Sequence, residues 1–159
     1  MTNDVKPDSS GPSPRTINPP HYFVLSLVAM GLLRWLIVSP PLLGPIAWVG
    51  LLPVVVGVAV AMRAARQFAD AGTNIVPLTR STALVTDGMF ARSRNPMYAS
   101  MVAVVLGVAL VLDRAAPWIV PPMFVAILRL RFIRHEERLM AATFGQAYLD
   151  YKARVRRWL

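Results

Sequence analysis

The sequence predicts an all-α polytopic membrane protein with about four transmembrane helices and a cytoplasmic, amphipathic C-terminal helix. Of its 159 residues 55% are hydrophobic and the mean hydropathy is +0.50, yet the formal net charge is +9. The apolar residues gather in runs about as long as a membrane span, and most basic residues lie between or after these runs. This pattern is typical of integral membrane proteins, whereas a disordered basic chain would be far less apolar.

Residues 1–20 are interpreted as a flexible tail. They hold five of the fourteen prolines, with Ser, Asn and Asp between them, a composition that does not support a packed core. The segment differs from a signal peptide, because its polar part is too long and no apolar core follows Lys6 closely. Residues 21–159 are then one membrane domain.

The apolar runs predict where the spans lie. The four expected transmembrane helices are near residues 21–39, 46–64, 96–112 and 117–133. The stretch 72–95 holds no clean span, because Pro77 and the turn at Asp87-Gly88 interrupt it. After Arg129 the chain becomes strongly basic, and its amphipathic pattern predicts a helix that continues to Trp158.

The basic residues predict the orientation of these spans. The loops 39–45 and 113–116 carry one arginine between them, whereas residues 63–94 carry five and the region from Arg129 onward carries eight arginines and lysines. Segments rich in Lys and Arg face the cytoplasm, so both termini should be cytoplasmic, in a bacterial inner membrane or an equivalent one. The aromatic belt at the outer interface would then comprise Trp35, Trp48 and Trp118.

The residue types exclude several chemistries. The chain has no cysteine, which excludes disulfides, thiolate catalysis and cysteine metal sites. Its two histidines, His21 and His135, are far apart, and no ligand spacing suits a metal, so we expect none. A basic chain is also typical of nucleic-acid binders, but here the charge lies at the ends of apolar runs. The expected partners are therefore membrane lipids and not nucleic acid.

Polar residues cluster in the stretch RSRNPMYAS, residues 92–100, directly before the third apolar run. Asn is a favoured N-cap and Pro a favoured first helical residue, so Asn95 and Pro96 predict a helix start. Capping leaves the two arginines and Tyr98 unexplained. A helix N-terminus with arginines beside it suits a carboxylate or a phosphate; the alternative is contact between the arginines and lipid headgroups.

Two adjacent acids, Glu136 and Glu137, follow the fourth apolar run. Neighbours on a helix point about 100° apart, so at least one glutamate should face the bundle. The alternative is a solvated face on which Arg134 and Arg138 pair with the glutamates. An acid just past the membrane end of a span is a candidate functional residue.

Aromatic residues recur at near-helical spacing in FGQAYLDYKARVRRW, residues 144–158, at Phe144, Tyr148 and Tyr151. Gly145 either breaks this helix or packs tightly. The simplest interpretation is an amphipathic helix on the bilayer, with its basic side toward anionic headgroups. That interpretation is compatible with a second role for the segment.

Taken in order, these segments resemble the isoprenylcysteine carboxyl methyltransferase and phospholipid methyltransferase family of integral membrane enzymes. The matching stretches are LVTDGMFARSRNPMY (84–98) and EERLMAATFGQAYLDYKARV (136–155). They follow the family pattern Leu-Val-x-x-Gly-x-Tyr/Phe, Arg-His/Asn-Pro-x-Tyr, Glu-Glu-x-x-Leu and Phe-Gly-x-x-Tyr-x-x-Tyr. The resemblance covers residues 72–158, about half the chain, and the first two spans match only in kind.

The resemblance implies S-adenosylmethionine as cofactor, bound near the cytoplasmic face by the segments 72–98 and 129–158. A glutamate suits the ammonium of this cofactor, an arginine at a helix start suits its carboxylate, and aromatic rings suit its adenine and sulfonium. The residues predicted to bind the cofactor are Gly88, Phe90, Arg94, Asn95, Tyr98, Glu136, Glu137 and Tyr148. The residues predicted to be catalytic are Glu136, Glu137, Arg129 and Arg134.

The implied reaction is methyl transfer to a lipid or lipid-anchored acceptor that arrives from the membrane. The candidates to hold an anionic acceptor are Arg129, Arg131 and Arg134. A carboxylate acceptor needs no base at neutral pH, whereas an amine acceptor needs one, and a glutamate whose pKa burial raises would serve. The chain departs from the carboxyl methyltransferase pattern at Thr82, Asn95 and Ser100. The acceptor is therefore either an isoprenylcysteine-type carboxylate or a phospholipid-like amphiphile.

Two other functions compete with methyl transfer. A nicotinamide-dependent membrane reductase of the sterol-reductase-like type has a similar Arg-x-Pro-x-Tyr segment, but such enzymes are usually larger and have more spans. A non-enzymatic small transporter or assembly protein is the second alternative. A transporter would normally place its polar residues near the bilayer midplane, whereas here they gather at the predicted cytoplasmic ends of the spans.

Overall fold

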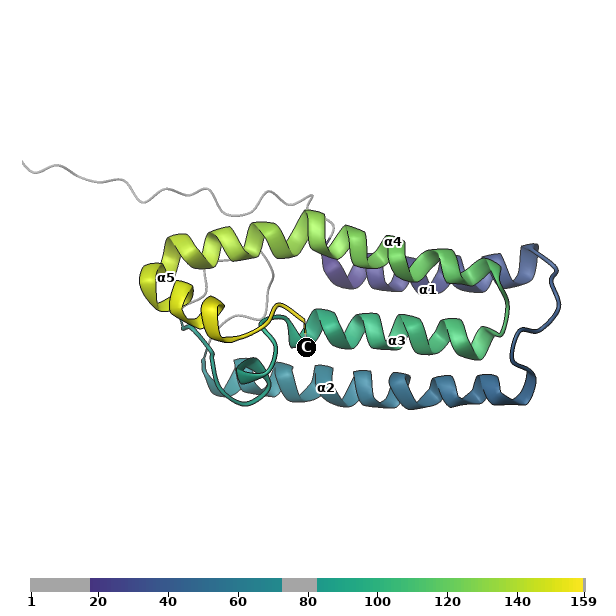
Figure 1. Ribbon diagram of the computed structural model, residues 1–159, viewed down its shortest axis with the longest axis horizontal. Coiled ribbons are helices and arrows are strands. Elements are labelled where there is room, and N and C mark those ends of the chain that lie inside the picture. Colours follow the sequence, from purple (N-terminus) through teal and green to yellow (C-terminus); the bar gives the residue numbers. More distant parts are fainter. Residues whose placement is uncertain (1–17, 73–82, 159) are drawn as a thin grey trace, which may run out of the picture.

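The computed structural model describes residues 18–72 and 83–158, and within these ranges the chain contains helices and no strand (Figure 1). This confirms the all-α prediction. The helices are α1 (Pro19–Leu36), η1 (Gly44–Gly50), α2 (Leu51–Asp70), η2 (Gly88–Ala91), α3 (Pro96–Leu112), η3 (Ala116–Ile119), α4 (Val120–Ile127), η4 (Leu128–Ile133) and α5 (Arg134–Arg154). Most of the predicted N-terminal tail, together with Pro77 and Thr82, lies outside the described residues.

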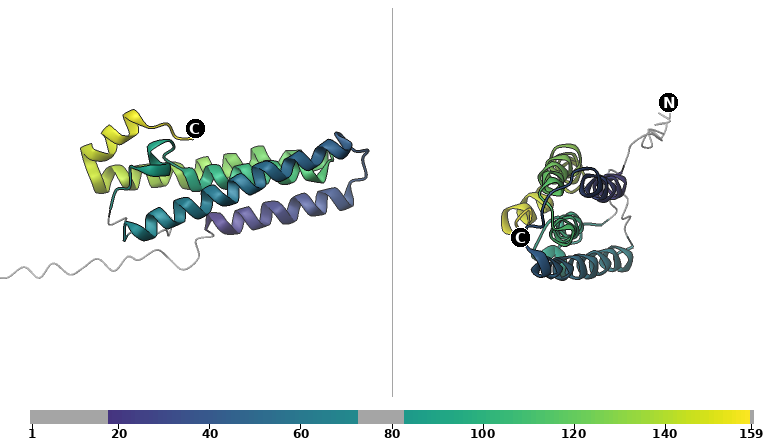
Figure 2. Two further views of the ribbon diagram at one scale, coloured as in Figure 1. Left: turned by 90° about the horizontal axis from the view of Figure 1, so that it is seen from below. Right: turned by 90° about the vertical axis from the view of Figure 1, so that its right-hand side faces the viewer.

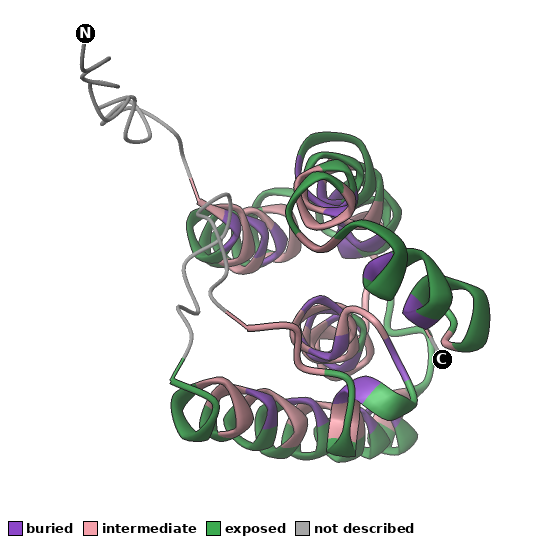
Figure 3. Cartoon of the chain, turned by 90° about the vertical axis from the view of Figure 1, so that its left-hand side faces the viewer, coloured by how far each residue is buried: buried purple, intermediate pink, exposed green. Residues whose placement is uncertain are grey.

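The long helices form an antiparallel bundle with α3 at its centre. α3 packs against α2, α1 and α4, and α1 also packs against the rod formed by η3 and α4 (Figures 1 and 2). The shared core includes Met30 of α1, Val105 and Ala109 of α3, Phe124 of α4 and Leu128 of η4. Buried residues lie where the helices face one another (Figure 3), while many large apolar side chains are exposed on the outer sides. An outer surface of this kind suits lipid better than water.

Two helical segments are long and apolar enough to cross a membrane, by length and composition: Gly44–Asp70 and Ala116–Arg154. They contain the second and fourth predicted spans. α3, Pro96–Leu112, coincides with the third predicted span and is apolar but shorter. α1 ends at Leu36 and not at residue 39. Two prolines follow Ser39, and a residue directly before a proline is disfavoured in the α-helical conformation. An arrangement of four spans stays a prediction.

The C-terminal rod is longer than a membrane requires. From Ala116 to Gly145 it extends for roughly 45 Å at ~1.5 Å per residue, whereas a hydrocarbon core is about 30 Å thick. Charged residues begin with Arg129 and Arg131 and become frequent from Arg134 onward. The apolar part that is suited to a membrane therefore ends before α5, and the polar residues of α5 lie beyond it.

The helices α2 and α3 approach closely because small residues face each other across their interface. A Cβ atom added to Gly57 would lie 2.7 Å from the carbonyl oxygen of Ser100, and one added to Gly107 would lie 2.5 Å from the carbonyl oxygen of Gly50. The two residues on each helix are seven apart, about two turns, so both contacts fall on the same faces. Close packing of this kind between small residues is a common way to join helices in lipid.

Replacing Gly57 with alanine should therefore destabilise the bundle. The added methyl group would press on the Ser100 carbonyl and on Val104 Cγ2, 2.8 Å away, and overpacking of this kind costs about 1–3 kcal/mol. The measurement is thermal unfolding of the detergent-purified protein, followed by circular dichroism. The matched control is Gly31→Ala on α1, where no atom lies within 4 Å of an added Cβ. Equal melting temperatures for the two variants would contradict the predicted role of this contact.

Asp113 joins the two connections at the end of the bundle opposite the chain terminus. It adopts a left-handed conformation (φ 52°), and its carboxylate accepts hydrogen bonds from the backbone N–H groups of Leu42 (2.9 Å), Leu43 (2.7 Å) and Gly44 (3.0 Å). These hydrogen bonds, that of Leu43 foremost, lower the pKa of Asp113 below its usual range. Exposed tryptophans of three helices lie near these connections, in keeping with the predicted aromatic belt: Trp35, Trp48 and Trp118.

The C-terminal segment is not one helix to Trp158, as predicted, because α5 is broken at Gly145 and ends at Arg154; its position on the bilayer stays a prediction. α5 continues directly from η4, and at Gly145 the backbone takes φ 53° and ψ −128°, a conformation that side chains other than glycine rarely adopt. The chain reverses there, and its last residues return to the start of α3 (Figure 1). No atom lies within 4 Å of a Cβ added at Gly145, so the residue breaks the helix and does not serve close packing.

Candidate functional site

The segment that carries the RSRNPMYAS motif is held from two sides. On one side α2 supports it: Gln67 Oε1 accepts a hydrogen bond from the Met89 N–H (3.0 Å), and the Phe68 and Phe90 rings meet edge to face at 4.9 Å. On the other side the Tyr151 hydroxyl donates to the Phe90 carbonyl (2.7 Å). The start of α3 is thereby clamped between the end of α2 and the returning end of α5.

Glu137 is the centre of a cluster of charges. Its carboxylate receives two hydrogen bonds from Arg157, at 2.8 Å each, and lies 3.1 Å from Arg94 Nη1 and 3.6 Å from Lys152 Nζ. The Glu137 and Arg94 side chains are only 10% and 9% exposed. A two-pronged arginine–carboxylate pair, as Arg157 forms here, is strong and directional. Glu137 therefore ties α5 to the chain terminus and to the start of α3.

The charges around Glu137 determine its ionisation. Burial alone would raise the pKa of this carboxyl, but the hydrogen bonds from Arg157 and the charges of Arg94, Arg157 and Lys152 outweigh burial and hold the pKa below its usual range. The same hydrogen bonds raise the pKa of Arg157. Glu137 is thus a permanent anion at neutral pH, neutralised by its partners.

Glu136 has a different partner, as the 100° offset between helix neighbours allows. The Tyr98 hydroxyl of α3 donates a hydrogen bond of 2.5 Å to Glu136 Oε1. Burial raises the pKa of Glu136, and the hydrogen bond from Tyr98 opposes this only in part. The alternative of a solvated pair with Arg134 and Arg138 does not hold, because both glutamates bond across to other elements.

Asn95 occupies the N-cap position of α3, but its side chain makes no capping hydrogen bond. The prediction of a side-chain cap is wrong, because the Asn95 amide donates instead to the Arg157 carbonyl (3.0 Å). Ser93 Oγ also donates to that carbonyl (3.4 Å), and the Arg94 N–H donates to the Arg156 carbonyl (2.9 Å). The returning chain terminus therefore binds the residues just before α3, and its carbonyl groups compete for the asparagine side chain.

The two arginines of the motif have different surroundings. Arg92 is exposed, whereas the Arg94 guanidinium is buried beside Glu137. Arg94 Nε is buried and has no hydrogen-bond partner, and such a group carries an energetic cost unless something binds it. Tyr148 is buried near this charge cluster, and burial raises its pKa. Arg94 thus keeps a buried donor, Nε, without a hydrogen-bond partner beside Glu137, and Tyr148 lies next to its guanidinium.

Seven of the predicted cofactor residues gather at this end of the molecule, between the start of α3 and α5: Phe90, Arg94, Asn95, Tyr98, Glu136, Glu137 and Tyr148. The ring of Phe90 faces α2 rather than the glutamates. Gly88 lies at the margin, with φ 54° and its Cα against the Gln67 side chain, so the requirement for glycine there is conformational and steric.

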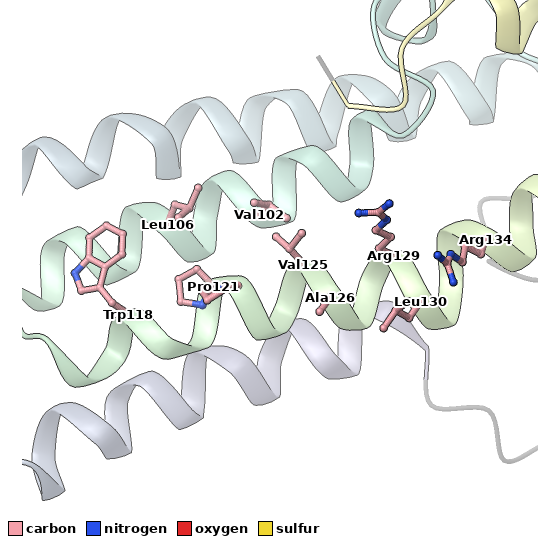
Figure 4. Close-up of a pocket in the computed structure, with 10 residues that line it drawn as sticks. Val102, Leu106, Trp118, Pro121, Val125, Ala126, Arg129, Leu130 and Arg134 are labelled. Atoms are coloured by element: carbon pink, nitrogen blue, oxygen red, sulfur yellow. The ribbon is translucent and has the colours of Figure 1, made fainter.

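Arg129 and Arg134 lie apart from this cluster. They line the end of a groove of about 840 Å³ between α3 and the rod of α4 and η4 (Figure 4). The remaining lining is apolar: Val102, Leu106, Trp118, Pro121, Pro122, Val125, Ala126 and Leu130. Two of the three predicted acceptor-holding arginines therefore line this groove, whereas the prediction for Arg131 is wrong, because its guanidinium donates to the Tyr22 hydroxyl of α1.

Sequence reasoning missed several residues that shape the site, namely Gln67, Phe68, Ser93, Lys152 and Arg157. Arg157 stands among several basic residues near the end of the chain, and no spacing distinguishes it from its neighbours. Ser93 lies inside the quoted motif, so a test of every polar residue of that motif would have included it.

A family model described as phospholipid methyltransferase matches residues 45–147, nearly two thirds of the chain. The chain belongs to the phospholipid methyltransferase family. The match confirms the resemblance drawn from the motifs and extends it toward the N-terminus over α2. Membership in this family implies a methyltransferase that acts on lipid-like substrates, and with the two long apolar helices it supports association with a membrane.

The chain is also similar to an uncharacterized protein of Haemophilus influenzae. It is 33% identical over 63 residues, which is 40% of this chain and the whole of that protein. No solved structure matches the chain. The family match ends at residue 147, so the clamp formed by Tyr151, Lys152 and Arg157 lies beyond the matched region.

Proposed function

We propose that this protein transfers a methyl group from S-adenosylmethionine to a membrane-associated acceptor, either an isoprenylcysteine-type carboxylate or a phospholipid-like amphiphile. The observation that carries the proposal is the buried Arg94 side chain, whose Nε has no partner, next to the acid pair of a methyltransferase-family chain. The proposal includes cytoplasmic termini, which reporter fusions to each end of the chain would test.

The chemistry of these residues suits the groups of the cofactor. The free Nε–H of Arg94 suits a carboxylate. Glu136 is the acid that suits an ammonium, because the charge of Glu137 is already neutralised by arginines. The aromatic faces of Tyr98 and Tyr148 suit adenine or a sulfonium. In this arrangement Glu137 is a positioning residue, since it holds Arg94 in place.

S-adenosylmethionine supplies an electrophilic methyl group on its sulfonium. The chain contributes binding and orientation, which account for much of the rate enhancement in a displacement that needs no bond to the protein. The clamp on the start of α3 would also help to exclude water. With an amine acceptor, Glu136 would take up the proton, and its raised pKa favours that role. With a carboxylate acceptor, Glu136 has only to bind.

Calorimetry on the detergent-purified protein tests the proposal. S-adenosylmethionine and S-adenosylhomocysteine should each bind with measurable heat, because they share the amino-acid and adenosine parts that the site would recognise. NADPH should not bind. Heat with NADPH alone would favour the reductase alternative, and no heat with any of the three would favour a non-enzymatic role. Either result would reject the proposal.

A further inference from the structure

The groove between α3 and α4 combines a long apolar wall with two cations at one end (Figure 4). From Trp118 to Leu130 its wall follows thirteen residues of the rod, roughly 18 Å of helix, which is more than half of a hydrocarbon core about 30 Å thick. The cations Arg129 and Arg134 stand at the end nearer α5. The groove therefore has the length and polarity of a lipid chain with its head group.

A π-helical turn places both arginines on the groove. Residues five apart on an α-helix would point about 140° away from each other. η4, Leu128–Ile133, is instead a π-helix, whose i→i+5 hydrogen bonds bring residues five apart nearly one above the other. Arg129 and Arg134 are five apart, and both line the groove. π-turns are rare and occur frequently at functional sites.

Neither arginine is engaged by the part of the chain that the structure describes. No hydrogen bond or ion pair joins Arg129 or Arg134 to a described residue. Arg131, on the same turn, contrasts with them, because its guanidinium donates to the Tyr22 hydroxyl of α1 and lies over the Tyr22 ring. Two unpaired cations side by side at the rim of an apolar groove repel each other and attract an anion.

We propose that this groove binds a long-chain amphiphile whose hydrocarbon chain lies between α3 and α4 and whose anionic group pairs with Arg129 and Arg134. The same two charges disfavour an amphiphile whose only charge is an ammonium. Val102 in the groove is one helical turn from Tyr98, so the groove begins one turn of α3 away from the residue that bonds Glu136. The assignment of this amphiphile as methyl acceptor rests on the proposed function; its binding does not.

The test measures binding to the full-length protein in neutral detergent without any cofactor. Spin-labelled stearate is titrated, and the immobilised fraction is read by electron paramagnetic resonance; spin-labelled methyl stearate and stearylamine are the neutral and cationic comparisons. Stearate should bind at least tenfold more tightly than either. Arg129→Gln and Arg134→Gln should each weaken stearate binding about tenfold, the effect of losing a charge-assisted hydrogen bond. The matched control Arg131→Gln, on the α1 side, should leave stearate binding unchanged.

Three results would overturn the inference. Equal binding of stearate and its methyl ester would show that lipid chains fill the groove without regard to charge. An equal loss from Arg131→Gln would show a general surface attraction. Competition by acetate alone, at the same concentration as stearate, would show an anion site that needs no chain. Because S-adenosylmethionine is absent, failure of the methyltransferase proposal in calorimetry and failure of the groove in this assay are separate outcomes.

Discussion

Replacing Glu137 with glutamine should lower the free energy of unfolding by about 3 kcal/mol, the cost typical of removing one partner from a buried ion pair. The substitution keeps the size of the side chain and removes the charge that Arg94 and Arg157 share. Arg94 would then be a buried cation without an anion, and the chain terminus would lose its anchor. Chemical unfolding of the purified protein, followed by circular dichroism, measures the change.

The matched control is Asp150→Asn, which makes the same change from acid to amide on an exposed surface of α5. The Asp150 carboxylate accepts a hydrogen bond from Gln146 Nε2, and the Arg154 Nε–H donates to the backbone carbonyl of Asp150. We expect a change within about 0.5 kcal/mol for this control. If Glu137→Gln and Asp150→Asn are equally stable, Glu137 does not anchor the clamp.

The pH dependence of stability follows from the lowered pKa of Glu137. A carboxyl whose pKa is lower in the folded chain stabilises the fold above its unfolded pKa, ordinarily 4.5, and this contribution is lost as the pH falls through the lower folded value. Wild type should therefore lose more stability than Glu137→Gln when the pH is lowered below about 4.5. Parallel curves for the two proteins would contradict this assignment.

Replacing Glu136 with glutamine should have the opposite profile, with little loss of stability and a large loss of cofactor affinity. The amide oxygen of glutamine still accepts the hydrogen bond that Tyr98 donates to Glu136. The negative charge that would hold the ammonium is gone, and losing a buried charged partner costs about 2 kcal/mol or more, roughly 30-fold in affinity. Calorimetry with S-adenosylhomocysteine measures this loss in a ligand that cannot react.

Tyr98→Phe is the companion variant, because it removes the hydroxyl that orients Glu136 and keeps the carboxylate. We expect an affinity between those of wild type and Glu136→Gln. If Glu136→Gln binds S-adenosylhomocysteine as tightly as wild type does, the acid pair has no part in binding the cofactor, and its role is confined to the structural contact with Tyr98.

The helices of this protein follow from local patterns in the sequence. α3 begins at Pro96 and ends at Leu112, as predicted, because proline is suited to the first helical position and Asp113 takes the left-handed turn that ends the helix. The break at Gly145 was one of two predicted alternatives. The family could also be recognised from the sequence, since its motifs are short, ordered and local.

The partners of the polar residues were not predictable from the same patterns. A pair of adjacent glutamates implies that the two differ in surroundings, but not which one meets Tyr98 and which one meets the arginines. The capping preference of Asn95 was overridden by a hydrogen bond to the Arg157 carbonyl, 62 residues away in sequence. Contacts over such separations depend on the path of the chain after Gly145, which no local pattern contains.

The sequence alone therefore determined the helical class, the bounds of α3 and the family, because hydrophobic periodicity and capping act within a few residues. Tertiary structure decided which residue has which role at the site. It pairs Glu137 with Arg157 of the chain terminus and Glu136 with the Tyr98 hydroxyl. It also leaves Arg94 Nε without a hydrogen-bond partner. It also set Arg129 and Arg134 on one groove through a π-turn. The physical reason is that charges and hydrogen bonds select partners by distance in space, whereas spacing along the chain records only direction around a helix.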